Sequence, residues 1–193
     1  MTGMEKRESA KERILKVADE LFYREGIRAV GIDRIIEESG VAKASFYRSF
    51  PTKDDLVVAY LELRFKRSMG NFDRVRREHP DSALDQLRSL MDILVDGMKR
   101  PDYRGCAHMN AVVEFPEELH PVHAKALECR NALWAEVAAM AREAGIPDSK
   151  ELADHIRMLW SGAVMVAYIN KKEFRPESFS IASKMLIEDR LAR

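Results

Sequence analysis

The sequence predicts an all-α protein of about nine helices, with a three-helix head at its amino end and a larger helical body behind it. Apolar residues recur at steps of three and four along most of the 193 residues. Capping residues and glycine or proline stops separate these segments. The strict alternation that marks half-buried strands does not occur. We therefore predict a head over residues 1–54 and a body over residues 55–193.

The first helix of the head is marked at both ends. Ser9 and Glu12 can form a capping box, in which the side chain of each residue accepts the backbone amide of the other. An apolar stripe from Ile14 to Phe22 predicts one buried face. Gly26 is the expected stop, because glycine readily takes the left-handed conformation that ends a helix.

Two short helices follow, over residues 32–39 and 42–49, joined by a tight turn that contains Gly40. Phe46 and Phe50 are expected to face inward and anchor the second of these helices. The arrangement is a helix-turn-helix, in which the second helix can present its exposed face to the major groove of DNA.

The body begins with a long helix that we expect from Lys53 to about Glu78, capped by Thr52. A later helix is expected to be capped within residues 148–151 and to run to about residue 171. The remaining helices are predicted over about 84–98, 106–115 and 122–144, with a last one ending near residue 191.

The amino-acid composition indicates what class of protein the chain belongs to. With 46% hydrophobic and 33% charged residues, the chain is typical of a soluble folded protein. It has no run of about 18 uncharged apolar residues, and its charged amino end lacks the apolar core of a signal peptide. We expect a cytoplasmic protein without a membrane partner.

The net charge and the reactive side chains argue against several other functions, namely nucleic-acid binding by overall charge, catalysis and metal binding. The 32 basic and 32 acidic residues give a net charge of zero, so an overall positive charge cannot be what binds nucleic acid. No nucleophile–base pair, glycine-rich phosphate loop or HExxH motif indicates an enzyme. Cys106 and Cys129 are expected to be reduced thiols, although a redox pair stays open. Pro116 and Pro121 interrupt the nearby histidine spacing, so we predict no metal and no cofactor.

The exposed side of the helix over 42–49 suits DNA. Lys43 can reach a base edge or a phosphate, and Arg48 can donate a forked pair of hydrogen bonds to guanine. The Ser45 and Tyr47 hydroxyls suit phosphate oxygens, which fix the register on DNA. Lys53 lies at the amino end of the next helix, where free amides already favour an anion.

The head also carries three blocks of a known pattern: residues 14–22, Glu25-Gly26 with residues 32–36, and residues 39–56, which read SGVAKASFYRSFPTKDDL. On these blocks the stretch from Glu12 to Leu56 resembles the head of the TetR family of transcription regulators. The resemblance implies DNA contacts from Lys43, Ala44, Ser45, Tyr47, Arg48, Ser49 and Lys53. Three residues depart from those frequent in the family, namely Gly31, Ala42 and Ser49.

The resemblance implies a regulator that binds a palindromic operator as a homodimer and is released by a small effector. Repression is the expected mode, and activation stays open. Ten methionines favour an adaptable apolar interior, so the effector is expected to be mostly hydrophobic. Two other classes stay open: an enzyme or small-molecule carrier, and an interaction protein that keeps the fold without binding DNA.

The helix over 152–170 is apolar on two faces, so it is either central in its own fold or shared with a partner. With the last helix it resembles the two-helix dimerisation element of the family. The predicted interface consists of Ile156, Leu159, Trp160, Ala163, Val166, Ala167, Ala182, Met185 and Leu186. The other face holds Met158, Gly162, Met165 and Ile169. A core within one chain is the alternative.

The resemblance also implies a pocket for the effector inside the body. The candidates are polar, polarisable or aromatic residues within apolar helical segments: Met91, Cys106, His108, Asn110, Glu114, Phe115, His123, Trp134, Trp160 and Met165. For each of them the alternative is a core group whose hydrogen bonds are satisfied within the chain.

Overall fold

The computed structural model describes residues 8–192, which form nine α-helices and no strand. The helices run in the order α1 (Ala10–Glu25), α2 (Ile32–Ser39), α3 (Lys43–Ser49), α4 (Lys53–Glu78), α5 (Ala83–Lys99), α6 (Ala107–Glu114), α7 (Pro121–Glu143), α8 (Ser149–Ile169) and α9 (Glu177–Leu191). The predicted all-α class is confirmed. Residues 1–7 of the predicted head lie outside the described residues.

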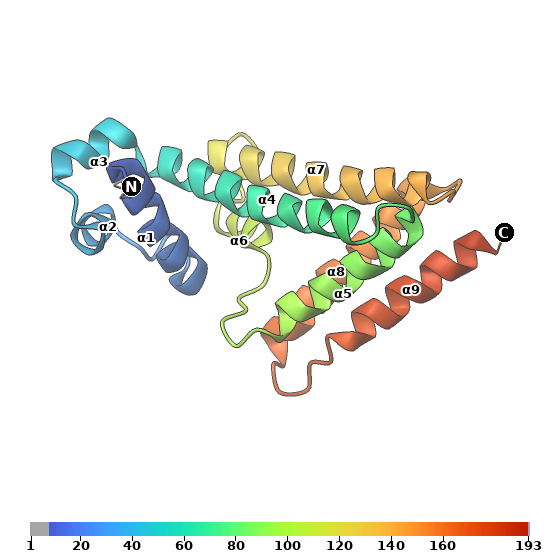
Figure 1. The fold of residues 1–193 in the computed structure, drawn as a ribbon. Helices are drawn as coiled ribbons and strands as arrows, with labels where there is room; N and C mark the ends of the chain where they lie inside the picture. Colours follow the sequence, from blue (N-terminus) through green and yellow to red (C-terminus); the bar gives the residue numbers. More distant parts are fainter. Residues whose placement is uncertain (1–7, 193) are drawn as a thin grey trace, which may run out of the picture.

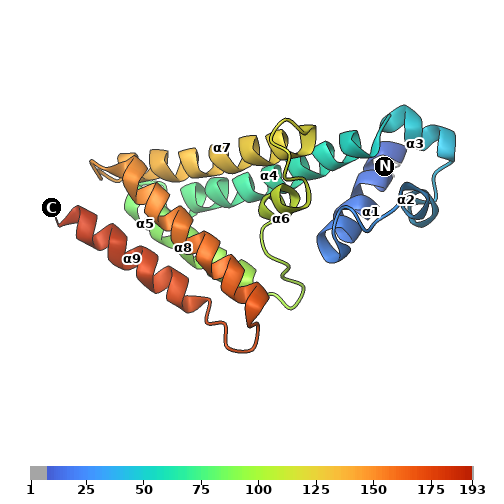
Figure 2. The ribbon, with the colours of Figure 1, turned by 180° about the vertical axis from the view of Figure 1, so that it is seen from behind.

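The head and the body occupy opposite ends of an elongated molecule. Helices α1, α2 and α3 cluster at one end, and α4 leads away from them beside α7 (Figure 1). Helices α5, α8 and α9 run obliquely to this pair, and α9 lies on the outside against α5 and α8 (Figure 2). The short α6 packs on α7 and touches α4 close to the head. None of the described helices is long and apolar enough to cross a membrane.

Local capping sets most helix starts. Both predicted caps of the head region are present, and each is a complete capping box, Ser9 with Glu12 and Thr52 with Asp55. Asp148 is the N-cap residue of α8, as predicted, but its side chain makes no capping hydrogen bond. Its carboxylate instead accepts a hydrogen bond from Arg190 on α9 at 3.2 Å. An ion pair to a neighbouring helix has replaced the local bond.

Buried apolar residues form two separate clusters. The first fills the head and continues along α4 to Leu61 and along α7 to Ala126. The second begins at Phe72 on α4 and at Val137 on α7, and it fills the rest of the body. Between the clusters α4 has no buried residue, and α7 has Cys129 alone. Residues 62–71 of α4 and 127–136 of α7 therefore form a level of weaker apolar packing that crosses the body between the two clusters.

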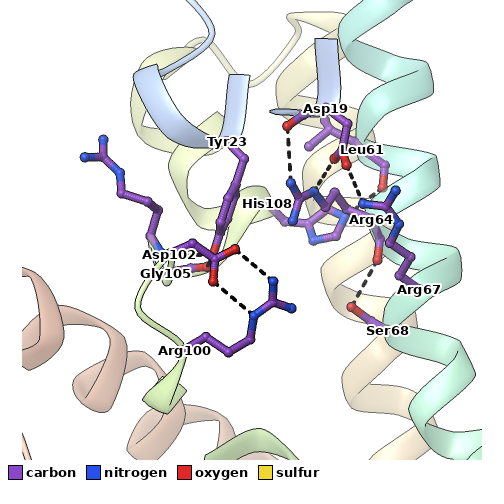
Figure 3. Close-up of polar contacts among 11 residues, drawn as sticks. Asp19, Tyr23, Leu61, Arg64, Arg67, Ser68, Arg100, Asp102, Gly105 and His108 are labelled. Atoms are coloured by element: carbon purple, nitrogen blue, oxygen red, sulfur yellow. Dashed lines mark hydrogen bonds and ion pairs between the residues drawn. The ribbon is translucent and has the colours of Figure 1, made fainter. Parts of the chain in front are cut away.

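An ion-pair cluster joins α1 to α4. Asp19 is only 5% exposed, and its carboxylate accepts hydrogen bonds from the guanidinium groups of Arg64 and Arg67 (Figure 3). Arg64 also stacks on the ring of Tyr23, 4.0 Å from its centroid. Two α4 side chains thus hold α1 through one nearly buried carboxylate.

The loop before α6 joins the head to α8. The Tyr23 hydroxyl donates to the Gly105 carbonyl at 3.0 Å and accepts from the Arg104 amide at 2.9 Å. From the other side, the Tyr168 hydroxyl hydrogen-bonds with the Arg104 carbonyl. Gly105 has φ of 73°, and any side chain there would collide with Tyr168. This close approach requires glycine.

Candidate nucleic-acid interface and interior site

Helix α3 is anchored by one face and leaves the other open. Phe46 and Phe50 are buried, as predicted, and Val41 in the preceding turn is buried with them. Gly40 in that turn has the left-handed conformation (φ 62°, ψ 30°) that ends α2. The opposite face carries Tyr47, whose side chain is 42% exposed. Local packing alone therefore presents the predicted contact face to solvent.

The charged residues of this face are held only loosely. Lys43, Ala44 and Arg48 are exposed. The Lys43 ammonium lies 3.2 Å from the Asp33 carboxylate, and Arg48 donates to the Ser45 hydroxyl at 3.0 Å. Exposed pairs of this kind contribute only about 0–1 kcal/mol. Both cations can exchange their partners for phosphates or base edges at little cost.

Two predicted contacts are partly engaged within the head. Ser49 is half-buried, and its hydroxyl donates to the Ser45 carbonyl at 2.9 Å, a common bond within a helix. Lys53 is also half-buried, and its ammonium lies 6.0 Å from the Phe22 ring centroid. Burial lowers the pKa of Lys53.

Two helix starts in the head lack side-chain caps. Gly31 precedes α2 and Ala42 precedes α3, and neither makes a capping hydrogen bond from its side chain. The first amides of these helices therefore receive no side-chain acceptor from the capping position, and free amides at a helix start favour anions. Gly31 and Ala42, which depart from the family pattern, therefore bring no hydroxyl to these positions but leave the first backbone amides of α2 and α3 available to an anion.

The predicted effector residues divide between the two core clusters. His108 and His123 are buried, and each ring bonds a backbone carbonyl, that of Leu61 at 3.1 Å and that of Phe115 at 2.7 Å. Phe115 itself belongs to the first core cluster. In contrast, Met91, Trp134 and Trp160 lie in or against the second cluster. The level between the clusters separates the two sets.

Two predicted pocket residues have other surroundings in the fold. The Glu114 carboxylate accepts hydrogen bonds from the amides of Ile27 and Arg28 at 3.0 and 2.7 Å, so it ties the body to the head. Met165 is 52% exposed on the outer surface of α8. Asn110 has partners of its own, because it donates to the Arg104 carbonyl and bonds the Tyr168 hydroxyl.

The predicted dimer residues divide between the inside and outside of the chain. Ile156 is wrong as an interface residue, because it is fully buried in the core of its own chain. Trp160 packs edge-on against Phe179 of α9, with ring centroids 5.5 Å apart. Val166 and Met185 are exposed, whereas Leu159, Ala163, Ala167, Ala182 and Leu186 are half-buried. On α8 itself, the most exposed large apolar residues are Ile169 and Met158, which belong to the other predicted face.

Sequence reasoning missed Arg130. It lies on the inward stripe of α7, four residues after Ala126 and four before Trp134. Its guanidinium donates to the Ser161 hydroxyl on α8 at 2.7 Å, and its other terminal nitrogen is buried without a hydrogen-bond partner. A charged residue at an apolar-stripe position was the available signal. Among the described residues, no group of three side chains is arranged to hold a metal.

Family models match most of the chain. Residues 14–60 match bacterial regulatory proteins of the tetR family, and residues 83–180 match the tetracyclin repressor-like C-terminal domain. The crystal structure of SCO4454, a TetR-family transcriptional regulator from Streptomyces coelicolor, is 35% identical with a TM-score of 0.86. That similarity covers 94% of this chain and 95% of the other.

Two further transcriptional regulators are similar to this chain at lower identity. The transcriptional regulator AcuR of Cereibacter sphaeroides is 27% identical over 176 residues, which cover 87% of this chain and 79% of that protein. An uncharacterized HTH-type transcriptional regulator of Lactococcus lactis is 27% identical over 108 residues. That alignment spans just over half of either protein, 55% of each.

Proposed function

Because this chain belongs to the TetR family of DNA-binding transcription regulators, we propose that it binds a palindromic operator as a homodimer and that a small effector releases it. The proposed mode is repression in the cytoplasm. The observation that carries the proposal is the exposed face of α3 around Tyr47, backed by buried Phe46 and Phe50.

The proposed contacts divide into two kinds. Tyr47, Ser45 and Lys53 bind phosphates and set the position of the head on the duplex. Arg48 and Lys43 reach base edges, where a forked guanidinium can discriminate guanine by about 1–3 kcal/mol. Ala44 and Ser49 pack along the groove wall. One head of this size binds weakly, so two heads about one helical turn apart are needed for a stable complex.

The surface of α8 and α9 supports a dimer. Met158, Val166 and Ile169 of α8 and Ile181 and Met185 of α9 are all exposed. A groove of about 750 Å³ lies between the two helices, and its lining includes Met158, Leu159, Gly162, Ala163, Val166 and Leu186. Neighbouring exposed apolar residues beside a groove are typical of a protein–protein interaction site. A second copy packed here would bury the face that a single chain leaves in water.

Helix α4 is the proposed link between the effector and the heads. It carries Lys53 at its first turn and passes through both core clusters. Asp19 couples it to α1, so a shift of α4 moves the head. An effector changes DNA affinity only by its different affinities for the two arrangements.

Selection from random duplexes tests the DNA proposal. The purified full chain should recover a palindromic site, with half-sites about one turn apart. Tyr47→Phe should weaken binding to all duplexes alike, and Arg48→Ala should relax preference at particular base pairs. Recovery of no preferred sequence would favour an interaction protein that does not bind DNA.

Light scattering tests the dimer. Met185→Glu should give monomers and weaken operator binding, because a charge would enter the proposed apolar interface. Val113→Glu is the matched control, since Val113 is also an exposed apolar residue but lies on α6, away from the groove. If both variants stay dimeric, α8 and α9 do not form the interface.

A further inference from the structure

Arg130 carries a charge into the level between the two core clusters. Its stripe neighbour Ala126 belongs to the first cluster, and Trp134 packs against the second. One terminal nitrogen donates to the Ser161 hydroxyl, and the other is buried and unpartnered. Native proteins rarely leave a buried donor without an acceptor, so this nitrogen calls for a specific explanation.

Among the described residues, no carboxylate pairs with the Arg130 guanidinium. Within residues 8–192 Arg130 forms no ion pair, although many arginines of the body do. The Ser161 hydroxyl donates its own hydrogen bond to the Arg157 carbonyl at 2.8 Å and brings no charge. Desolvation lowers the pKa of Arg130 and the positive charge of Arg157 lowers it further, whereas the nearby Cys106 side chain raises it as an electrostatic and hydrogen-bonding neighbour. The Arg130 guanidinium is therefore left without a carboxylate partner.

Further polar groups lie around the same level. The Tyr103 hydroxyl, in the loop between α5 and α6, is also buried without a partner. The Cys106 thiol acts electrostatically on both Arg130 and Tyr103, and it is a weak hydrogen-bonding neighbour of Arg130. His108 adds no free donor there from Nε2, which bonds the Leu61 carbonyl. Two unpartnered donors from different elements thus occur beside one thiol.

We propose that this level binds the carboxylate of a small organic acid, with the apolar part of the acid against the second core cluster. A carboxylate accepts two parallel bonds from the edge of one guanidinium, which suits the single arginine available. A phosphate carries more charge and more acceptors than one arginine and a hydroxyl can serve. The inference rests on the proposed effector-dependent regulation and names the chemical class of the effector.

Protein stability gives the first test. An uncompensated buried charge destabilises the ligand-free protein, so Arg130→Met should raise its melting temperature. Arg142→Met is the matched control on an exposed turn of the same helix, and it should change the melting temperature little. A lower melting temperature for Arg130→Met would show that the guanidinium already has a stabilising role, and it would overturn the proposal.

Binding gives the second test. Sodium butanoate, octanoate and benzoate are titrated calorimetrically into the full chain, each beside its uncharged amide. At least one acid should bind while its amide binds at least about tenfold more weakly, and Arg130→Met should lose about 10- to 100-fold in affinity for that acid. Arg142→Met should bind like the wild type. Binding of none of the acids, or equal binding by Arg130→Met, would overturn the proposal.

The operator separates this inference from the proposed function. Acid that binds through Arg130 and releases the selected duplex supports both. Acid that binds through Arg130 but leaves the duplex bound supports the carboxylate site and contradicts the effector role. Duplex binding with no acid binding contradicts the carboxylate site alone.

Discussion

Removing the Asp19 carboxylate tests how the head is attached to the body. Asp19 holds Arg64 and Arg67 of α4 from a position on α1 that is 5% exposed. The Arg64 side chain is 22% exposed and the Arg67 side chain 54%. Asp19→Ala would therefore leave one guanidinium largely buried without its anion and another mostly in water.

The size of the effect follows from these exposures. Losing one partner of a fully buried pair costs about 3–5 kcal/mol, and losing an exposed pair costs about 0–1 kcal/mol. Because the carboxylate is buried while the arginines reach solvent, we expect Asp19→Ala to cost about 2–4 kcal/mol. For a chain of this length that lowers the melting temperature by about 4–16 °C. Arg67→Ala should cost less than about 1 kcal/mol.

Thermal unfolding followed by circular dichroism measures both variants at one fixed protein concentration, since dimerisation stabilises by mass action. A double-mutant cycle between Asp19 and Arg64 isolates their coupling. Equal losses in Asp19→Ala and Arg67→Ala, or no coupling in the cycle, would refute the reasoning from burial.

Three further predictions concern single side chains. Ala42→Ser should stabilise the protein by about 0.5–2 kcal/mol in urea unfolding, because Ala42 has the extended backbone of a cap but no capping oxygen. Burial lowers the pKa of His108 from 6.5, so the unfolded chain takes up a proton that the folded chain resists. Stability should then fall as the pH drops below about 6.5, and His108→Gln should lose less melting temperature between pH 7 and pH 5.5. Burial raises the pKa of Cys129 to about 11, so peptide mass spectrometry after alkylation at pH 8 should find it unmodified in the folded protein.

The helix boundaries were predictable because capping is local chemistry. Ser9 with Glu12, and Thr52 with Asp55, lie three residues apart and need no distant partner. Gly40 likewise ends α2 by its own left-handed conformation. Asp148 shows the limit of this reasoning, since its partner Arg190 is 42 residues away and outcompetes the local bond.

The faces of α8 were not predictable from periodicity. Both faces are apolar, and the pattern does not say which one meets the rest of the same chain. In the fold α8 packs against both α7 and α9, which buries Ile156 and leaves Met165 outside. The choice depends on the positions of two other helices.

The interior site was only half predictable. Glu114 was expected in a pocket, yet its partners Ile27 and Arg28 lie more than 80 residues away on the head. Such a pairing leaves no local trace in the sequence. Arg130 did leave one, as a charge on an apolar stripe, and the contact with Ser161 on α8 explains its placement only once the fold is known.

The extent of the first core cluster affects how chimeric regulators should be built. Leu56 and Leu61 of α4, Ala111 of α6 and Ala126 of α7 pack in the same cluster as the head. A breakpoint after residue 54 would therefore cut through one packed interior and set a foreign surface against α6. A graft that transfers the donor's segment through residue 61, together with matching residues on α6 and the first turns of α7, keeps that interior intact and exchanges operator preference alone.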